Sequence, residues 1–142
     1  MPNKKIGFLI KQVYILHEQQ LNKRFSQFGL TASQTFTLVH LLVAREHDEQ
    51  VTQKDLEKRF DISNPTVTGI INRLEAKGLV KRIPCKHDAR SKYIVVTDKA
   101  IELDKELRKA FEAADQELVT ALNENEINEL SQYLIKILRN HS

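Results

Sequence analysis

Two short helical segments joined by a very short turn limit the possible folds of this chain more than any other feature. Residues 52–60 begin with a threonine suited to an N-cap and an aspartate three positions later, the spacing of a capping box. The next two residues leave room only for a tight turn. A second helix follows, capped by Ser63 or Asn64 and stopped by Gly78. Two helices of these proportions predict a helix-turn-helix.

The second of these helices separates an apolar side from a polar one. The apolar side, expected to face the core at about 100° per residue, consists of Val67, Ile70, Ile71 and Leu74. The opposite side has small and short polar residues with one arginine: Pro65, Thr68, Gly69, Asn72, Arg73 and Ala76. A merely solvated helix face would more often carry pairs of Glu and Lys. This polar side is instead suited to a DNA major groove, where Asn, Thr and Arg hydrogen-bond to base edges.

The same helix carries two further signals of contact with DNA. Ser63, Asn64 and the free backbone N–H groups of the first turn are suited to a phosphate. Gly69 lowers helix stability at an exposed position, which indicates that another group approaches it closely. We therefore expect this helix to be a recognition helix whose N-terminal part meets the DNA.

A two-stranded hairpin is predicted directly after this helix. Residues 79–84 and 93–97 are rich in β-branched side chains and flank a polar tip. The candidate contacts at the tip are Lys86, His87, Asp88, Arg90, Ser91 and Lys92. A guanidinium there suits a narrow A·T minor groove, and we expect Asp88 to orient Arg90 through an ion pair. Taken alone, the tip also fits a flexible charged turn, but its place after a helix-turn-helix favours a DNA-binding wing.

The positive charge of the chain is concentrated in this middle region. The net charge of the 142 residues is only +3 at pH 7. Residues 51–97 contain ten basic and five acidic side chains, whereas residues 98–142 contain six basic and ten acidic ones. A basic region between less basic ends is expected of a module that binds phosphates, although the charge alone also fits a solvated basic face.

Helices are also predicted on both sides of this region. The apolar spacing places them at residues 5–28, Thr31 to about Arg45, residues 98–122, and Asn123 onward. Only four glycines and three prolines interrupt the chain, in agreement with long helices. The expected fold class is mainly α (α+β), a winged helix-turn-helix with a two-stranded wing, flanked by N- and C-terminal helices.

The two terminal segments carry more apolar residues than one small lobe needs. Left exposed, they would form a patch that a soluble monomer rarely tolerates. We therefore expect a twofold dimer formed by residues 1–30 and 123–142, with residues 31–97 as the DNA-binding lobe and residues 98–122 as the connecting helix. The predicted interface residues are Ile6, Leu9, Ile10, Val13, Ile127, Leu130, Leu134, Ile137 and Leu138. Such a dimer places two recognition helices roughly 34 Å apart and predicts an inverted repeat in double-stranded DNA.

Over nearly its whole length the chain resembles the MarR family of bacterial winged-helix regulators. The resemblance is carried by residues 29–34, 63–68 and 73–80, and most closely by residues 88–92 followed by residues 96–97. It implies a dimer whose first and last helices interlock and are joined to the DNA-binding lobe by the long helix. It also implies a transcriptional regulator, expected to be a repressor, that binds a palindromic operator as a homodimer.

The resemblance also assigns roles to individual residues. It makes Arg90 the wing arginine of the minor groove and Asp88 its partner. The residues that it places at the recognition-helix surface are Ser63, Pro65, Thr66, Thr68, Asn72 and Arg73. It further implies a small aromatic or lipophilic effector, held where the first two helices meet the start of the long one. Such a ligand releases DNA by favouring the spacing of the two lobes that does not bind it.

Two other functions stay open from the sequence. Winged helices also serve as protein-interaction modules, but such a surface is expected to carry exposed aromatic or aliphatic anchors, which the polar side of this helix lacks. Cys85, beside Lys86 and His87, is a candidate redox site because neighbouring positive charge favours the reactive thiolate. Its oxidation would disturb the wing and release DNA.

Other classes of site are not expected. Cys85 and His87 supply only two metal ligands, and the remaining histidines lack ligand spacing. No cofactor is expected, and no phosphate-cradling loop, nucleophile elbow or His-Glu-x-x-His motif indicates an enzyme. No apolar run is long enough for a membrane span, no signal peptide is recognisable, and the single cysteine cannot form an internal disulfide. A cytoplasmic protein without a membrane partner, associated with the nucleoid when bound to DNA, is the expectation.

Overall fold

The computed structural model describes residues 5–88 and 90–142, which are mainly helical with one two-stranded antiparallel sheet. The first elements are α1 (Ile6–Phe25), the 3-10 turn η1 (Ser26–Phe28), α2 (Ala32–Glu46), α3 (Gln53–Phe60) and α4 (Asn64–Ala76). They are followed by β1 (Val80–Pro84), β2 (Lys92–Val96), α5 (Asp98–Leu118) and α6 (Glu124–Asn140). The predicted order of helices and hairpin, and the mainly α class, are confirmed.

Capping interactions begin the helices where the sequence predicts. Thr52 and Asp55 form a reciprocal box at α3, with distances of 3.2 Å and 2.9 Å between each side-chain oxygen and the other residue's backbone nitrogen. Asn123 and Glu126 do the same at α6, at 2.9 Å in both directions. The N-cap of α4 is Ser63, which settles the choice that the sequence left open. Each box satisfies two backbone N–H groups that the first turn of a helix leaves free.

Two boundaries differ from the prediction for local reasons. α1 ends at Phe25, and a single 3-10 turn continues to Phe28 before Gly29, whose φ of 70° suits a glycine. β2 ends at Val96 because the hydroxyl of Thr97 caps the first turn of α5, which removes this residue from the strand. Differences of this size are usual at the ends of elements.

The connecting helix is shorter than the predicted span of residues 98–122, because α5 ends at Leu118. The hydroxyl of Thr120 donates to the carbonyls of Gln116 and Glu117, at 3.1 Å and 2.8 Å. Such bonds from a side chain to the preceding turn compete with continuation of the helix. The chain then turns before Asn123 starts α6, so the connection between the two helices contains a bend.

The lobe of α2, α3, α4 and the hairpin is built around α2, which packs against α4, α5 and β2. The apolar side predicted for α4 is buried in this core and consists of Val67, Ile70, Ile71 and Leu74. Fully buried side chains of the neighbouring helices complete the core, including Leu38 from α2, Leu56 from α3 and Leu107 from α5. Burial of this stripe determines which side of α4 faces the solvent.

The hairpin is attached to the start of α3 by backbone contacts. The N–H of Ile94 donates to the carbonyl of Val51 at 2.8 Å, and Thr52 forms an isolated β-bridge with Tyr93. These contacts hold the hairpin at a defined position relative to the helix-turn-helix.

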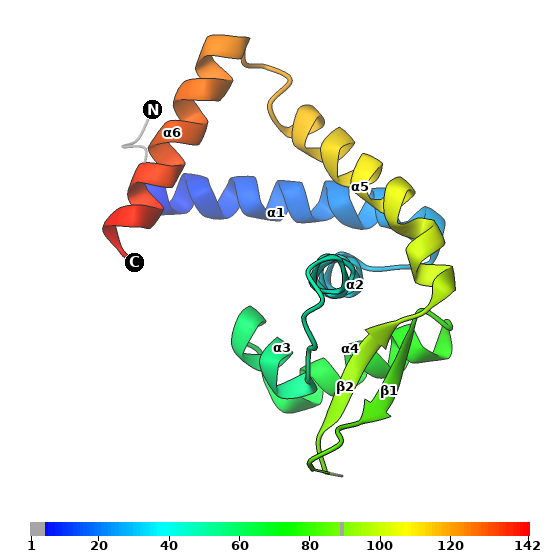
Figure 1. Cartoon of the computed structure of the whole chain (residues 1–142). Helices are drawn as coiled ribbons and strands as arrows, with labels where there is room; N and C mark the ends of the chain where they lie inside the picture. The colour runs from blue at the N-terminus through cyan, green and yellow to red at the C-terminus, as the bar shows by residue number, and fades with distance from the viewer. Residues whose placement is uncertain (1–4, 89) are drawn as a thin grey trace.

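Figure 1 shows α1, α5 and α6 on one side of α2, and α3, α4 and the hairpin on the other. α5 packs against both α1 and α2, so it links the two regions. α6 has no buried residue, and in α1 only Leu21 and Phe25 near its end are buried. Within the part of the chain that the structure describes, none of the helices combines the length and apolar character needed to cross a membrane.

The exposed apolar residues of α1 and α6 form what we call the terminal apolar surface. Its members on α1 are Ile6, Phe8, Leu9, Ile10, Val13, Tyr14, Ile15 and Leu16. Its members on α6 are Leu130, Tyr133, Leu134, Ile135, Ile137 and Leu138. The predicted interface residues all belong to this surface except Ile127, which is half-buried. Phe8, Tyr14 and Tyr133 add aromatic side chains that the sequence prediction did not include.

The side chain of His40, on the central helix α2, packs against α3. Its ring packs edge-on against Phe60, with ring centroids 5.6 Å apart and an interplanar angle of 77°. Burial, together with the positive charge of Arg59, lowers the pKa of His40 below its ordinary value. The neutral imidazole is therefore the form that fits this contact.

Candidate nucleic-acid interface

α4 presents its polar side to the solvent, as its buried apolar side requires. We call this side the outer side of α4; its members are Asn64, Pro65, Thr68, Gly69, Asn72, Arg73 and Ala76. Thr68 and Gly69 are half-buried, and the other members are exposed. Ser63 and Thr66, which flank the start of this side, are exposed as well. Every residue predicted for the recognition helix is therefore at least partly accessible.

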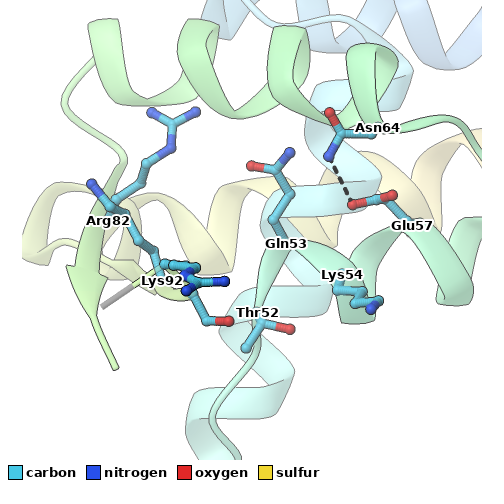
Figure 2. A pocket seen from close by; sticks show the side chains of 9 residues that line it. Thr52, Gln53, Lys54, Glu57, Asn64, Arg82 and Lys92 are labelled. Carbon is cyan, nitrogen blue, oxygen red and sulfur yellow. Dashed lines mark hydrogen bonds between the residues drawn. The ribbon is translucent and has the colours of Figure 1, made fainter. Parts of the chain in front are cut away.

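The first turn of α4 is held by its own side chains and by α3. The hydroxyl groups of Ser63 and Thr66 lie 2.9 Å apart, and the Ser63 oxygen accepts from the Thr66 backbone N–H at 3.4 Å. The Asn64 amide nitrogen donates to the Glu57 carboxylate of α3 at 3.2 Å, which Figure 2 marks with a dashed line. The start of α4 is thus oriented before any ligand is present.

Gln53 of α3 contacts the middle of the outer side. Its amide nitrogen donates to the hydroxyl of Thr68 at 2.7 Å. The hydroxyl hydrogen and the methyl group of Thr68 are left for another partner. Gln53 was not among the predicted contacts, and the bond joins residues that only the helix-turn-helix geometry brings together.

The close approach predicted at Gly69 is made by the chain's own Arg73. A Cβ atom at position 69 would lie 3.1 Å from Nη1 of Arg73, so the guanidinium lies back over the glycine. The missing side chain at Gly69 therefore leaves room for the Arg73 head group on the outer side. This arrangement explains the glycine without an external group.

Arg82 of β1 joins the hairpin to α4. Its Nη2 donates to Oδ1 of Asn72 at 2.7 Å, and its Nη1 donates to Oε1 of Glu75 at 2.6 Å. The positive charge of Arg82 thus offsets Glu75, the first acidic residue along α4. In the sequence, Arg82 is marked only by its place in the basic middle region.

The wing has the predicted form, with β1 and β2 antiparallel and Pro84 paired with Lys92 at the last position before the tip. The tip side chains Lys86, His87, Asp88, Arg90 and Lys92 are exposed, and Ser91 is half-buried. Ala89, between the two central residues of the tip, lies outside the described residues.

The expected ion pair between Asp88 and Arg90 is replaced by a different contact. Oδ1 of Asp88 accepts from the backbone N–H of Arg90 at 3.0 Å. The ion pairs found in residues 5–88 and 90–142 do not include one between this carboxylate and the Arg90 guanidinium. A carboxylate that binds its neighbour's backbone shapes the turn and leaves the guanidinium free to face a ligand.

A basic hollow of about 390 Å³ lies between α3, the start of α4 and the wing. Figure 2 shows its lining residues, which are Thr52, Gln53, Lys54, Glu57, Asn64, Arg82, Arg90, Ser91 and Lys92. Four of these side chains are basic and one is acidic, so the hollow suits an anion. Lys54 was missed from the sequence, although the first helix of a helix-turn-helix commonly crosses the DNA backbone.

Cys85, the candidate redox residue, is half-buried at the base of the wing tip. A hydrogen bond with Cys85 raises the pKa of the Tyr93 hydroxyl above its ordinary value. The Cys85 backbone N–H donates to the carbonyl of Ser91 at 3.0 Å and closes the tip. In the described ranges, no group of three or more His, Cys, Asp or Glu side chains could hold a metal ion.

A short helix, a tight turn and a second helix followed by a two-stranded hairpin define a winged helix-turn-helix protein. The family model described as "MarR family" matches residues 28–91. This match, together with the relatives described next, supports a MarR-family winged-helix regulator.

Individual relatives agree with this assignment. The HTH-type transcriptional regulator SarZ of Staphylococcus haemolyticus is 27% identical over 90 residues, a match that spans 63% of this chain and 61% of the relative. The crystal structure of the reduced form of MarR from E. coli is 25% identical, with a TM-score of 0.88, and the match covers 97% of this chain and 99% of that one. The crystal structure of a MepR–DNA complex from S. aureus is 27% identical, with a TM-score of 0.83, and the match covers 99% and 100%.

Proposed function

We propose that the chain is a transcriptional regulator that binds double-stranded DNA sequence-specifically as a homodimer, and that it is not an enzyme. The observation that carries the proposal is the outer side of α4, which is polar, solvent-facing and flanked by the basic wing. The similar MepR chain, which was crystallised with DNA, supports it.

In the proposed complex α4 enters the major groove. Thr66, Asn72 and Arg73 approach base edges, and Ser63 lies near a phosphate at the helix N-terminus. We assign these roles because the four side chains are exposed on the same face of the protein. Each of them can reach DNA without any rearrangement of the core.

The wing and the basic hollow supply the contacts outside the major groove. Arg90, with a guanidinium that is not paired to Asp88, enters the minor groove, whose negative potential attracts it. Lys54 and Lys92, on opposite walls of the hollow, approach the phosphate backbone. Binding that depends on such phosphate contacts weakens steeply as the salt concentration rises.

The proposed dimer forms through the terminal apolar surface. Fourteen large apolar side chains of this surface are exposed, and Leu138 reaches 70% exposure. A patch of this kind on a monomer is unusual, and stable dimers bury roughly 1,600 Å² or more in total. Residues 1–30 and 123–142 then form the dimer, and residues 31–97 the DNA-binding lobe, with α5 between them. Two recognition helices roughly 34 Å apart fit an inverted repeat.

We further propose that the protein is a repressor and that a small aromatic or lipophilic effector releases it from DNA. A shallow hollow of about 370 Å³ between α2 and α5 supports this, since its lining residues are Phe36, Val39, Arg108, Phe111 and Glu112. The rings of Phe36 and Phe111 lie 5.4 Å apart, beside the Arg108 guanidinium. The Arg108 guanidinium is already ion-paired with Glu46 and Asp104, so the aromatic walls are the part of this hollow that suits a small aromatic or lipophilic ligand. Such a ligand should raise the melting temperature of the wild-type protein more than that of a Phe36→Ala variant.

Selection of bound sequences from a random pool of duplex DNA tests the main proposal. We expect one inverted repeat to be enriched, its affinity to fall steeply with added salt, and light scattering to report a dimer. A strictly monomeric protein that binds no duplex even at low ionic strength would contradict the proposal. It would leave a protein-interaction module as the better interpretation of the winged fold.

A further inference from the structure

Arg82 fixes the orientation of the Asn72 amide on the outer side of α4. Arg82 Nη2 donates to Asn72 Oδ1 at 2.7 Å. A guanidinium carries only donors, so the atom of the Asn72 amide that faces Arg82 must be its oxygen. The amide nitrogen of Asn72, with its two hydrogens, is therefore the group left for another partner.

Arg82 is itself held from several directions. Its backbone lies in the β-ladder opposite Ile94, and its side chain is only 19% exposed. Its second terminal nitrogen binds the carboxylate of Glu75, which follows Asn72 by one turn of α4. Hydrogen bonds from a charged donor are roughly twice as strong as neutral ones, so the Asn72 oxygen stays engaged in the folded protein.

The free groups of an asparagine side chain determine which base it recognises. Adenine is recognised when the amide donates to N7 and its oxygen accepts from the N6 amino group, so both ends of the amide are needed. Guanine presents two neighbouring acceptors, N7 and O6, and needs only donors. The bond to Arg82 uses one of the two lone pairs of the Asn72 oxygen and turns this oxygen toward the wing strand. An asparagine held in this orientation offers its amide nitrogen to a base, so it matches guanine and is poorly placed to form both hydrogen bonds to adenine.

We propose that Arg82 restricts Asn72 to donating hydrogen bonds, so that the base recognised by Asn72 in the bound DNA is guanine rather than adenine. Arg82 is then a positioning residue for sequence specificity, although it lies on the wing strand and outside the recognition helix. This inference rests on the proposed DNA binding and adds a base preference and the residue that sets it. Arg73 also offers only hydrogen-bond donors on the outer side, because its guanidinium, which lies over Gly69, has no acceptor.

Selection from a random duplex pool with the full-length wild type, Asn72→Ala and Arg82→Met tests the proposal. The position whose preference Asn72→Ala flattens is the position that Asn72 recognises. There the wild type should prefer guanine over adenine by about fivefold or more. Arg82→Met frees the Asn72 oxygen and should select adenine at least as often as guanine. Lys81→Met is the matched control, because it removes one exposed positive charge from β1; it should weaken binding to all sequences and keep the guanine.

Three results would overturn the inference: adenine at this position in the wild type, an unchanged preference in Arg82→Met, or an Asn72→Ala variant that alters no position. If Arg82→Met does not fold, as judged by circular dichroism, Asn72→Asp takes its place. Aspartate still accepts from Arg82 but carries no donor, so the guanine preference should be lost, and its retention would equally overturn the inference. A wild-type protein that selects no sequence at all contradicts the proposed function instead, so the two failures are distinguishable.

Discussion

Replacing Gly69 by alanine adds one methyl group to the outer side of α4. The backbone at this position is helical, and alanine in a helix interior is favoured over glycine by about 1 kcal/mol. The new Cβ atom would lie 3.1 Å from Nη1 of Arg73, a contact tighter than usual. Nη1 is the far end of a flexible side chain, so a small movement of the guanidinium relieves the contact at little cost.

We therefore expect Gly69→Ala to raise the free energy of unfolding by about 0.5–1 kcal/mol and the melting temperature by about 1–4 °C. Urea denaturation at one fixed protein concentration measures the change, because the stability of a dimer depends on concentration. In an Arg73→Ala background the same substitution meets no guanidinium, and the full gain of about 1 kcal/mol is expected.

The same methyl group is expected to weaken DNA binding, because it displaces the Arg73 head group from its place over Gly69. We expect the affinity for the selected duplex, measured by fluorescence anisotropy, to fall about tenfold, equivalent to about 1.4 kcal/mol. A variant less stable than the wild type would refute the argument that only a flexible side chain must move. A more stable variant with unchanged affinity would show that this part of α4 does not meet the DNA.

Four further changes test separate parts of the account. Arg90→Ala should lower the affinity for the best duplex in anisotropy titrations, and an unchanged affinity would contradict the proposed contact of Arg90 with the minor groove. Arg73→Ala should cost about 1–3 kcal/mol of discrimination between selected and random duplexes, whereas equal losses on all sequences would assign it to a phosphate. Leu134→Asp, in the terminal apolar surface, should yield a monomer in light scattering, and a variant that remains a dimer would contradict the proposed interface. Burial lowers the pKa of His40, so the folded protein binds fewer protons than the unfolded chain, and stability should fall as the pH drops below about 6.5. His40→Gln should reduce this fall in urea denaturation, and the exposed His47→Gln should not; equal pH profiles for the wild type and His40→Gln would refute the assignment.

The features that depend on neighbouring residues were predictable from the sequence. The caps at Thr52, Ser63 and Asn123 each need residues only three positions away, and the side-chain type at those positions indicates the bond. The buried side of α4 follows from helical periodicity alone, so the residues of its outer side are predictable from the sequence.

The features that depend on tertiary geometry were not predictable. Arg82 and Asn72 are ten positions apart, and Gln53 and Thr68 are fifteen apart, so no local pattern indicates either bond. The first bond requires the position of the wing relative to α4, and the second requires the angle between α3 and α4. The sequence did mark the wing as charged, but whether Asp88 binds a guanidinium or a backbone N–H depends on the geometry of the turn.

Hydroxyl-radical footprinting of the selected duplex tests most directly whether the two α4 helices of a symmetric dimer both contact the DNA through their outer sides. We expect two protected segments related by a dyad and separated by about one helical turn, roughly 34 Å, and both should disappear with Leu134→Asp. A single protected segment, or two that persist when the protein is monomeric, would contradict the symmetric arrangement.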